Sequence, residues 1–196
     1  MPSARQKKTI ISFMCLSACA LMAVAPPVVR SADAAKPMQP SAALEMVLSE
    51  EPKDFYESAA SANMLEIEAS KLAETKSTDA DVKAFAKTMI KDHTEAGQKL
   101  GKLATTKKVV LPSQLLKRHQ MMLDGLKEEE NGAEFDKEYR MKMVMSHKEA
   151  VSLFDHAAKK SPDPDIRAFA TEMLPKLQEH GAHAKKMEDA AKKKGG

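Results

Sequence analysis

Four titratable side chains interrupt the apolar faces of four segments of this chain. In each segment apolar residues recur at spacings of three and four, the pattern of an amphipathic helix. One position of each apolar face is instead a carboxylate or an imidazole, and these residues are Glu66, His93, His147 and His180. Such groups in apolar surroundings need hydrogen-bond partners or a bound cation, so they are the first candidates for chemistry.

The four positions are expected to lie at a similar depth in a helical bundle. At about 1.5 Å per residue, Glu66 lies roughly 15 Å from the turn that follows its helix, and His93 lies roughly 20 Å from the same turn. His147 and His180 are about 15 and 16 residues from the turn between their helices, so their depths also agree. Imidazole and carboxylate ligands suit zinc, iron, manganese or copper. We therefore predict that Glu66, His93, His147 and His180 bind one divalent transition-metal ion.

Three other interpretations stay open at this point. The cluster could be a polar network that only fixes helix packing in a non-catalytic envelope structural or interaction protein. The chain could also be a metal-dependent oxidoreductase, or a helical binder of an acyl chain or another apolar ligand. No catalytic residue is predicted, because the sequence has no phosphate-binding glycine loop, no G-x-S-x-G motif and no H-E-x-x-H motif.

Other polar residues near the four candidates are predicted either to supply further ligands or to lie outside the core. Glu179 and His183 lie four residues apart on one helix face and could supply further ligands. The remaining polar neighbours are expected to flank the core or to lie at the surface: Asp92, Glu149, His119 and His156.

The composition and periodicity predict an all-α fold. Aromatic residues make up only 4% of the chain and Trp is absent, which argues against a β-sandwich or barrel. The helical period predicts four long helices and one shorter helix between the second and the third: 54–76, 80–107, 113–128, 133–160 and 165–192.

Tight turns join the first two long helices and the last two, so each pair is expected to form an antiparallel hairpin. The connection between the second and third long helices is long enough to run back along the bundle, which makes those two helices parallel. The predicted fold is thus a four-helix bundle with a long helical crossover. Helix propensity alone does not separate it from an up-and-down bundle of five helices.

The N-terminal segment has the organisation of a secretory signal peptide. A basic stretch precedes an apolar run over residues 9–24, which is short for a membrane span. An A-x-A pattern at residues 32–34 predicts that the mature chain begins near Ala35, and an earlier cut after Ala25 is an alternative. We therefore predict that residues 1–34 direct export to the periplasm or cell envelope.

Two alternatives would attach the protein to a membrane. The apolar run could remain uncleaved as an anchor. The segment Leu16-Ser17-Ala18-Cys19 is similar to a bacterial lipobox, in which Cys19 would be acylated. The two cysteines of the chain both lie in this segment, so a cleaved mature chain would have neither disulfides nor cysteine metal ligands.

The charge balance excludes one class of partner. The whole chain has 31 basic and 28 acidic residues. Residues 1–34 carry four basic side chains and one acidic, so the remainder has 27 of each and no net charge. That balance lacks the basic footprint of a nucleic-acid-binding protein. Beyond the signal we predict a flexible linker over residues 35–52, the helical bundle over 53–190 and a basic tail over 191–196.

Four segments of the predicted bundle resemble a known family. They are NMLEIEASKLA (63–73), VKAFAKTMIKDHTEA (82–96), GAEFDKEYRMKMVMSHKEAVSLF (132–154) and IRAFATEMLPKLQEHGAHAK (166–185). In this order they are similar to the bacterial domain-of-unknown-function family 4142 (DUF4142) over about residues 52–188. The resemblance implies a ferritin-like four-helix fold, usually behind a signal peptide, in proteins often described as membrane or outer-membrane proteins. It implies no established activity, and the motif positions that carry over are Glu66, Asp92, His93, His147, Glu179 and His180.

The chain departs from the ligand pattern of ferritin-like di-iron proteins, which use a Glu-x-x-His motif on two of their helices. The residues three positions before the histidines are Ile90, Val144 and Leu177. The sequence therefore favours a mononuclear site, or a polar core without metal, over a di-iron centre.

Overall fold

The described part of the chain is built from α-helices. The structure is a computed structural model that describes residues 42–194. Within these residues it contains five helices and no strand: α1 (Ala42–Lys76), α2 (Ala80–Lys107), α3 (Lys117–Glu128), α4 (Ala133–Lys160) and α5 (Pro164–Lys194). The predicted all-α class is confirmed. The predicted signal peptide and Cys19 lie outside the described residues.

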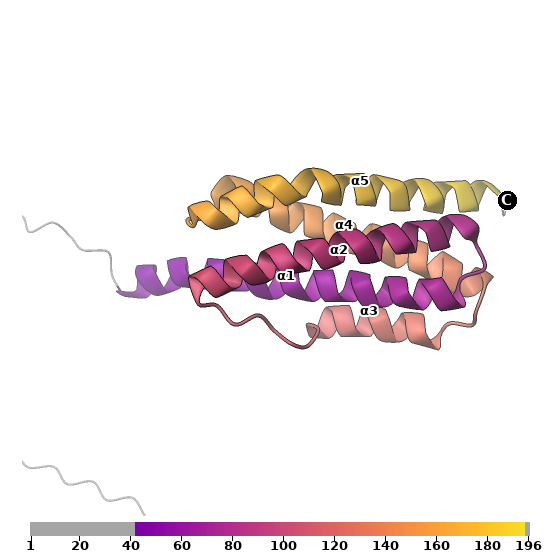
Figure 1. Cartoon of the computed structure of the whole chain (residues 1–196), viewed down its shortest axis with the longest axis horizontal. Coiled ribbons are helices and arrows are strands. Elements are labelled where there is room, and N and C mark those ends of the chain that lie inside the picture. Colours follow the sequence, from indigo (N-terminus) through magenta and orange to yellow (C-terminus); the bar gives the residue numbers. More distant parts are fainter. Residues whose placement is uncertain (1–41, 195–196) are drawn as a thin grey trace, which may run out of the picture. The chain divides into compact units, whose positions relative to one another are not determined.

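Helices α2 and α4 run parallel, as the crossover prediction requires. At one end of the bundle the backbone N–H of Gly132, just before α4, donates to the carbonyl of Lys76 at 2.8 Å. At the other end Nζ of Lys107 on α2 lies 2.8 Å from Oδ2 of Asp163, just before α5. The connection that contains α3 runs back along the bundle (Figure 1). An up-and-down bundle of five helices is therefore excluded.

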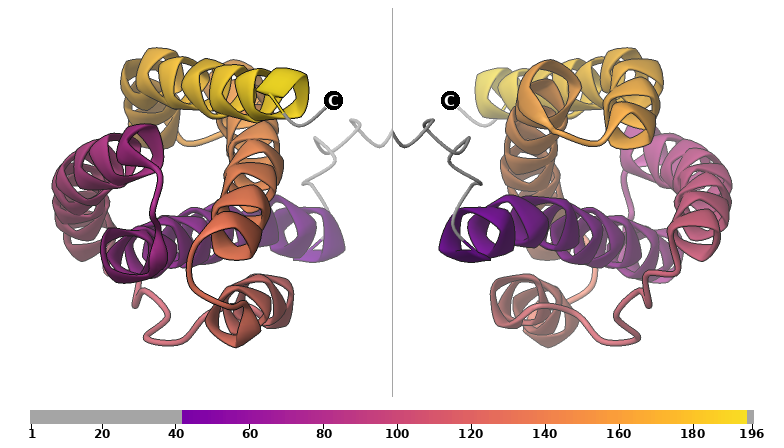
Figure 2. Two further views of the ribbon diagram at one scale, coloured as in Figure 1. Left: turned by 90° about the vertical axis from the view of Figure 1, so that its right-hand side faces the viewer. Right: turned by 90° about the vertical axis from the view of Figure 1, so that its left-hand side faces the viewer.

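Four helices surround a common interior. Viewed along the bundle, α1, α2, α4 and α5 enclose it, and α3 lies outside against α1 and α4 (Figure 2). None of the described helices contains an apolar stretch long enough to cross a membrane. The likeness to ferritins, which the family resemblance implied, stays a prediction.

Local sequence signals account for the ends of α2 and the start of α4. The carboxylate of Asp79 accepts hydrogen bonds from the N–H groups of Asp81 at 2.8 Å and Val82 at 3.3 Å, the geometry of an N-cap. Lys108 ends α2 in the left-handed conformation, with φ at 58°. Gly132 precedes α4 with φ at 97°, where a side chain would be strained.

The predicted bounds are confirmed for α2 and α4 and corrected elsewhere. Helix α1 begins at Ala42 rather than at residue 54, so residues 42–52 of the predicted linker are helical. Pro52 lies inside this helix, although proline lacks the N–H of a regular helical residue. The preceding residues include Ala, Leu, Glu and Met, which favour helix. Helix α3 begins four residues later than predicted.

The core consists of two apolar clusters with a polar layer between them. The first cluster lies near the α1–α2 turn and contains Leu65, Phe85, Met89, Phe135, Tyr139 and Met143. The second lies near the α4–α5 turn and contains Phe55, Leu100, Phe154, Ile166, Phe169 and Leu177. Along α2, His93 falls between Met89 of the first cluster and Leu100 of the second. The predicted candidate residues therefore occupy the boundary between the two clusters.

Candidate metal centre

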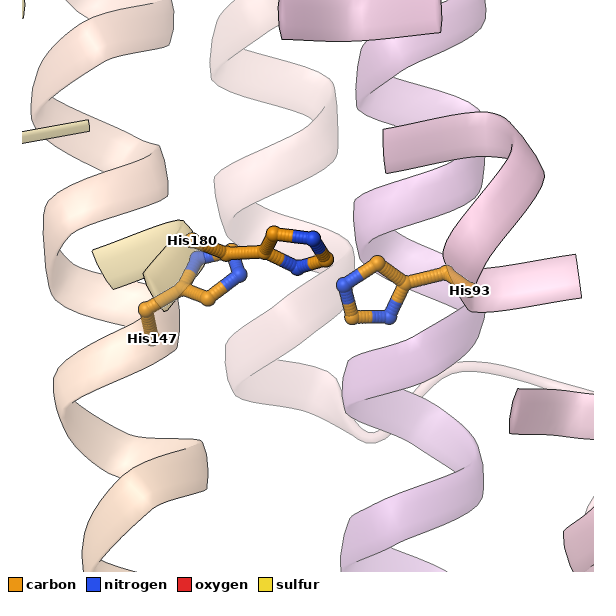
Figure 3. A group of neighbouring side chains, drawn as sticks. All are labelled: His93, His147 and His180. Atoms are coloured by element: carbon orange, nitrogen blue, oxygen red, sulfur yellow. The ribbon is translucent and has the colours of Figure 1, made fainter. Parts of the chain in front are cut away.

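The imidazoles of His93, His147 and His180 meet in the interior of the bundle. They project from α2, α4 and α5 toward one another (Figure 3). The ring centroids lie 5.7 Å apart for His93 and His147, 5.3 Å for His93 and His180, and 5.6 Å for His147 and His180. Each ring offers a nitrogen, and the three nitrogens lie within 4.8 Å of one another. All three residues are buried, so the predicted common depth is confirmed for the histidines.

In His147 and His180, the ring nitrogen that points away from the cluster donates a hydrogen bond, and this fixes which nitrogen carries the proton. Nδ1 of His147 donates to the backbone carbonyl of Met143 at 2.8 Å. Nε2 of His180 donates to Oδ2 of Asp92 at 2.9 Å. A carbonyl and a carboxylate only accept, so the protons sit on these two nitrogens. Nε2 of His147 and Nδ1 of His180 are left with their lone pairs.

Glu66 orients the third imidazole from α1. Nδ1 of His93 lies 3.0 Å from Oε2 of Glu66 and 3.2 Å from Oδ1 of Asn63, so it donates to oxygen acceptors and Nε2 keeps its lone pair. The other oxygen of Glu66, Oε1, accepts a hydrogen bond from Oγ of Ser146 at 2.7 Å and lies 3.7 Å from Nδ1 of His147. One buried carboxylate thus contacts side chains of α2 and α4 together.

The electrostatics keep Glu66 ionised and His93 neutral near pH 7. Burial by itself would raise the pKa of Glu66, but the neighbouring imidazoles and the hydroxyl of Ser146 outweigh it and hold that pKa below its usual value. Burial lowers the pKa of His93 to about 4 and also lowers the pKa of His180. Neutral imidazoles are the form that binds metal ions.

The three remaining nitrogens have the properties of a ligand set. Nε2 of His93, Nε2 of His147 and Nδ1 of His180 are buried and have no hydrogen-bond partner within the described residues. Buried acceptors that face one another without a donor are unfavourable. A metal-ligating histidine in a protein commonly donates from its other ring nitrogen to a carboxylate or carbonyl oxygen. His147 and His180 do so here, and His93 donates to the amide oxygen of Asn63 with the carboxylate of Glu66 3.0 Å away.

The other predicted ligands do not join this group. Among the described residues, the group of ligand atoms within 4.8 Å of one another comes from the three histidines. Glu66 is not part of this group, because it contacts Nδ1 of His93, on the far side of that ring from the cluster. Glu179 and His183, considered as further ligands, are exposed. Oε2 of Glu179 lies 3.3 Å from Nζ of Lys176, and the ring centroids of His183 and Phe85 lie 4.9 Å apart.

His119 was predicted at the surface, and this prediction is wrong, because its side chain is fully buried. Its Nε2 lies 3.4 Å from the carboxylate of Glu149, so the ring proton belongs there and Nδ1 accepts from Oγ of Ser61 at 2.7 Å. Ser61 in turn accepts from the N–H of Leu116 at 2.8 Å. His119 therefore attaches α3 to α1. Its spacing to the buried Leu123 was the signal that could have revealed this.

A glycine allows the helices to approach beside the cluster. A Cβ atom at Gly181 would lie 3.2 Å from Cβ of His147, a tighter contact than ordinary packing permits. Because Gly181 follows His180 directly, its small size brings α5 close to α4 where the two imidazoles meet.

Comparisons with known proteins bear on the fold. The profile of the family described as "Domain of unknown function (DUF4142)" matches residues 37–187. A solved structure titled "CopM in the Cu(II)-bound form" is similar, with a TM-score of 0.59 and 19% sequence identity. The match covers 69% of this chain and 94% of that chain. A search of curated proteins gives no match.

Proposed function

The chain belongs to the DUF4142 family, and we propose that its bundle binds one divalent transition-metal ion through His93, His147 and His180. The observation that carries this proposal is the convergence of three buried, unprotonated imidazole nitrogens from three helices. A single cation satisfies all three acceptors at once, which no described side chain does.

The spacing of the nitrogens fits such a site after a small adjustment. Metal–nitrogen bonds of about 2.0–2.1 Å at tetrahedral angles place ligand nitrogens roughly 3.3 Å apart. The three nitrogens lie within 4.8 Å of one another, so the rings close by up to about 1.5 Å when the ion binds. Three protein ligands leave a fourth position for water or another small ligand.

In this proposal Glu66 and Asp92 are positioning residues rather than ligands. Asp92 accepts a hydrogen bond from the proton-bearing nitrogen of His180, and the carboxylate of Glu66 lies 3.0 Å from the proton-bearing nitrogen of His93. Such contacts fix the tautomer and raise the basicity of the ring. The sequence-based prediction placed Glu66 in the metal's own ligand set. We replace that role because both oxygens of Glu66 already have partners: Oε2 lies beside Nδ1 of His93, and Oε1 accepts a hydrogen bond from Ser146.

Copper is the first ion to test. Neutral imidazoles suit zinc, copper, iron and nickel, and affinity at such sites is highest for copper among these divalent ions. The similar solved structure carries Cu(II) in its title, which agrees with this order. Zinc is the natural second ion, because it accepts three imidazoles in tetrahedral geometry.

Titration of chelator-stripped protein with Cu(II) and Zn(II), together with elemental analysis after dialysis, tests the proposal. We expect one ion per chain. In the His93→Ala/His147→Ala variant we expect affinity to fall by about 100-fold or more, because each single partner can cost 10–100-fold even when it only orients a ligand. The matched control is His156→Ala, since His156 is exposed. Metal retained by the double variant, or less than one ion in reloaded wild type, overturns the proposal and favours a packing role for the cluster.

The variant Glu66→Gln separates a positioning role from a ligand role. Glutamine keeps an acceptor for the N–H of His93 but loses the charge, so we expect Cu(II) affinity to fall by about 10–100-fold with one ion still bound. Circular dichroism of each variant checks that the helices persist. A loss as large as that of the histidine double variant would make Glu66 a ligand.

We also propose that the protein is exported, on the basis of its N-terminal segment. N-terminal sequencing and mass spectrometry of the protein recovered from the cell envelope test this. A start near Ala35 or directly after Ala25 identifies cleavage, and an acylated Cys19 identifies a lipoprotein. Recovery of the full-length chain in the cytoplasm contradicts export.

A further inference from the structure

A pocket of about 450 Å³ lies beside the histidine cluster, between α2 and α5. Its inner end is formed by Glu66, His93 and His180. Its walls are mainly apolar and include Ala59, Ala62, Leu100, Phe154, Phe169 and Met173. These residues come from all four helices of the bundle, so the pocket extends into the second apolar cluster.

Charged residues of both signs line the pocket mouth, and two ion pairs join α2 to α5 there. Nζ of Lys99 on α2 lies 2.5 Å from Oε1 of Glu172 on α5. Nζ of Lys176 lies 3.5 Å from Oδ2 of Asp92, again between these two helices. Because neither sign dominates, the mouth offers no field that would select a charged ligand. The apolar walls would also oppose burial of an unpaired charge.

We propose that this pocket binds a small, neutral, mainly apolar organic molecule that enters between α2 and α5 and lies against the imidazoles of His93 and His180. The volume falls in the range of small-molecule sites, and apolar walls with a few polar groups at one end are their usual lining. The carboxylate of Asp92 lines that end and can accept a hydrogen bond, so the fitting molecule carries one donor group on an apolar body.

This inference goes beyond metal binding and does not depend on it. The chain alone forms the pocket, and His147 is not among its lining residues. A bound molecule and a metal ion would nevertheless be neighbours, because His93 and His180 contact both. Binding of the molecule and binding of the metal ion can therefore be measured separately.

The neutral fluorescent amine N-phenyl-1-naphthylamine is a suitable probe, because it has an aromatic body and one N–H donor. The chain has no Trp, so the probe can be followed without interfering emission. We expect saturable binding to the metal-free protein with a blue shift. In Ala96→Leu the added atoms occupy pocket space, and we expect affinity to fall by at least about tenfold, or 1.4 kcal/mol.

The matched control is Ala84→Leu, the same change at an exposed position of α2. If Ala96→Leu does not fold, Met173→Gln makes the pocket wall polar at nearly constant size, with the exposed Met145→Gln as its control. An affinity that the pocket variants leave unchanged, or an absence of saturable binding to wild type, overturns the proposal.

Quenching by Cu(II) tests the location of the probe. Paramagnetic copper at the three histidines should quench the bound probe, whereas Zn(II) should not. In His147→Ala we expect the probe to bind with unchanged affinity and the quenching to disappear. Probe binding in a protein that takes up no metal would refute the proposed function and leave the pocket standing. Metal uptake without quenching would place the probe elsewhere and overturn the pocket proposal.

Discussion

Three hydrogen-bond acceptors determine what the histidine cluster can bind. The carbonyl of Met143, the carboxylate of Asp92 and the amide oxygen of Asn63 accept from the outer nitrogens of the three rings. The inner nitrogens therefore present lone pairs, and the cluster attracts cations rather than anions. Burial between the apolar clusters lowers the pKa of His93 and that of His180, because protonation would bury a charge.

At the residue scale, the burial of His93 predicts that the folded protein loses stability as the pH falls. The pKa of His93 is about 4 in the folded chain and about 6.5 when unfolded, so only the unfolded chain gains a proton between these values. Stability is therefore full above about pH 6.5 and falls as the pH approaches 4. Between pH 7 and pH 5 we expect metal-free protein to lose about 2 kcal/mol of unfolding free energy from His93 alone. His180 acts in the same direction, since burial lowers its pKa too.

Urea unfolding of the metal-free protein at the two pH values measures this loss. The variant His93→Gln should lose much less stability on acidification than wild type. His156→Gln, at an exposed position, should behave as wild type. A wild-type stability that does not change between the two pH values would show that His93 is not buried in neutral form.

The sequence could identify the three histidines of the cluster as buried, but not their partners. Each histidine occupies a position of an apolar helix face, so spacing alone predicted its burial. The role of Glu66 depends on which atoms Ser146 and Asn63 place around it, and these contacts join residues distant in the chain. Periodicity carries no information about such contacts, so a ligand and a positioning residue look the same in the sequence.

At the scale of the helices, Asp136 fixes how α4 meets the first hairpin. Its Oδ2 accepts hydrogen bonds from the N–H groups of Thr78 at 3.3 Å and Asp79 at 3.2 Å, and from Oγ1 of Thr78 at 3.3 Å. On the next turn of α4, Arg140 donates to the carboxylate of Asp79 at 2.5 Å. This half-buried network joins the start of α4 to the α1–α2 turn and thereby sets the height of His147.

We expect Asp136→Ala to destabilise the protein by about 2–3 kcal/mol, because it removes three hydrogen bonds to the carboxylate and takes away the acceptor of the Thr78 N–H. Glu134→Ala is the control, since Glu134 lies in the same first turn of α4 but is exposed. Urea unfolding curves give both values. A loss no larger than that of the control would mean that other contacts set the position of α4.

Helix bounds were predictable where capping residues mark them. Asp79 and Gly132 are strong local signals, and α2 and α4 begin directly after them as predicted. The start of α1 was missed because residues 35–52 are rich in Pro, Ser and Ala, a composition that predicts a linker, whereas the helix begins at Ala42. The burial of His119 was missed although its four-residue spacing to Leu123 places both on the face of α3 that is buried in the bundle.

At the scale of the whole bundle, the polar layer divides the core into two apolar clusters. A bound ion stabilises only the folded chain, because only folding brings the three imidazoles together. At a free ion concentration about 100-fold above the dissociation constant, we expect about 2.7 kcal/mol of added stability. For a domain of this size that raises the Tm by roughly 5–10 °C.

Thermal unfolding followed by circular dichroism, with and without Cu(II) or Zn(II), measures this shift. The double variant His93→Ala/His147→Ala should show no comparable rise. If the double variant and wild type shift equally, the ions act at other sites on the surface.

The distribution of the imidazoles between the hairpins has one more consequence. His93 belongs to the α1–α2 hairpin, whereas His147 and His180 belong to the α4–α5 hairpin. The polypeptide links these hairpins only through residues 108–132. An ion held by all three rings would thus cross-link two halves of the molecule that are distant along the chain. Like a disulfide that closes a long loop, it would restrict the conformational entropy of partly opened states, and the hairpins could not separate until the ion was released.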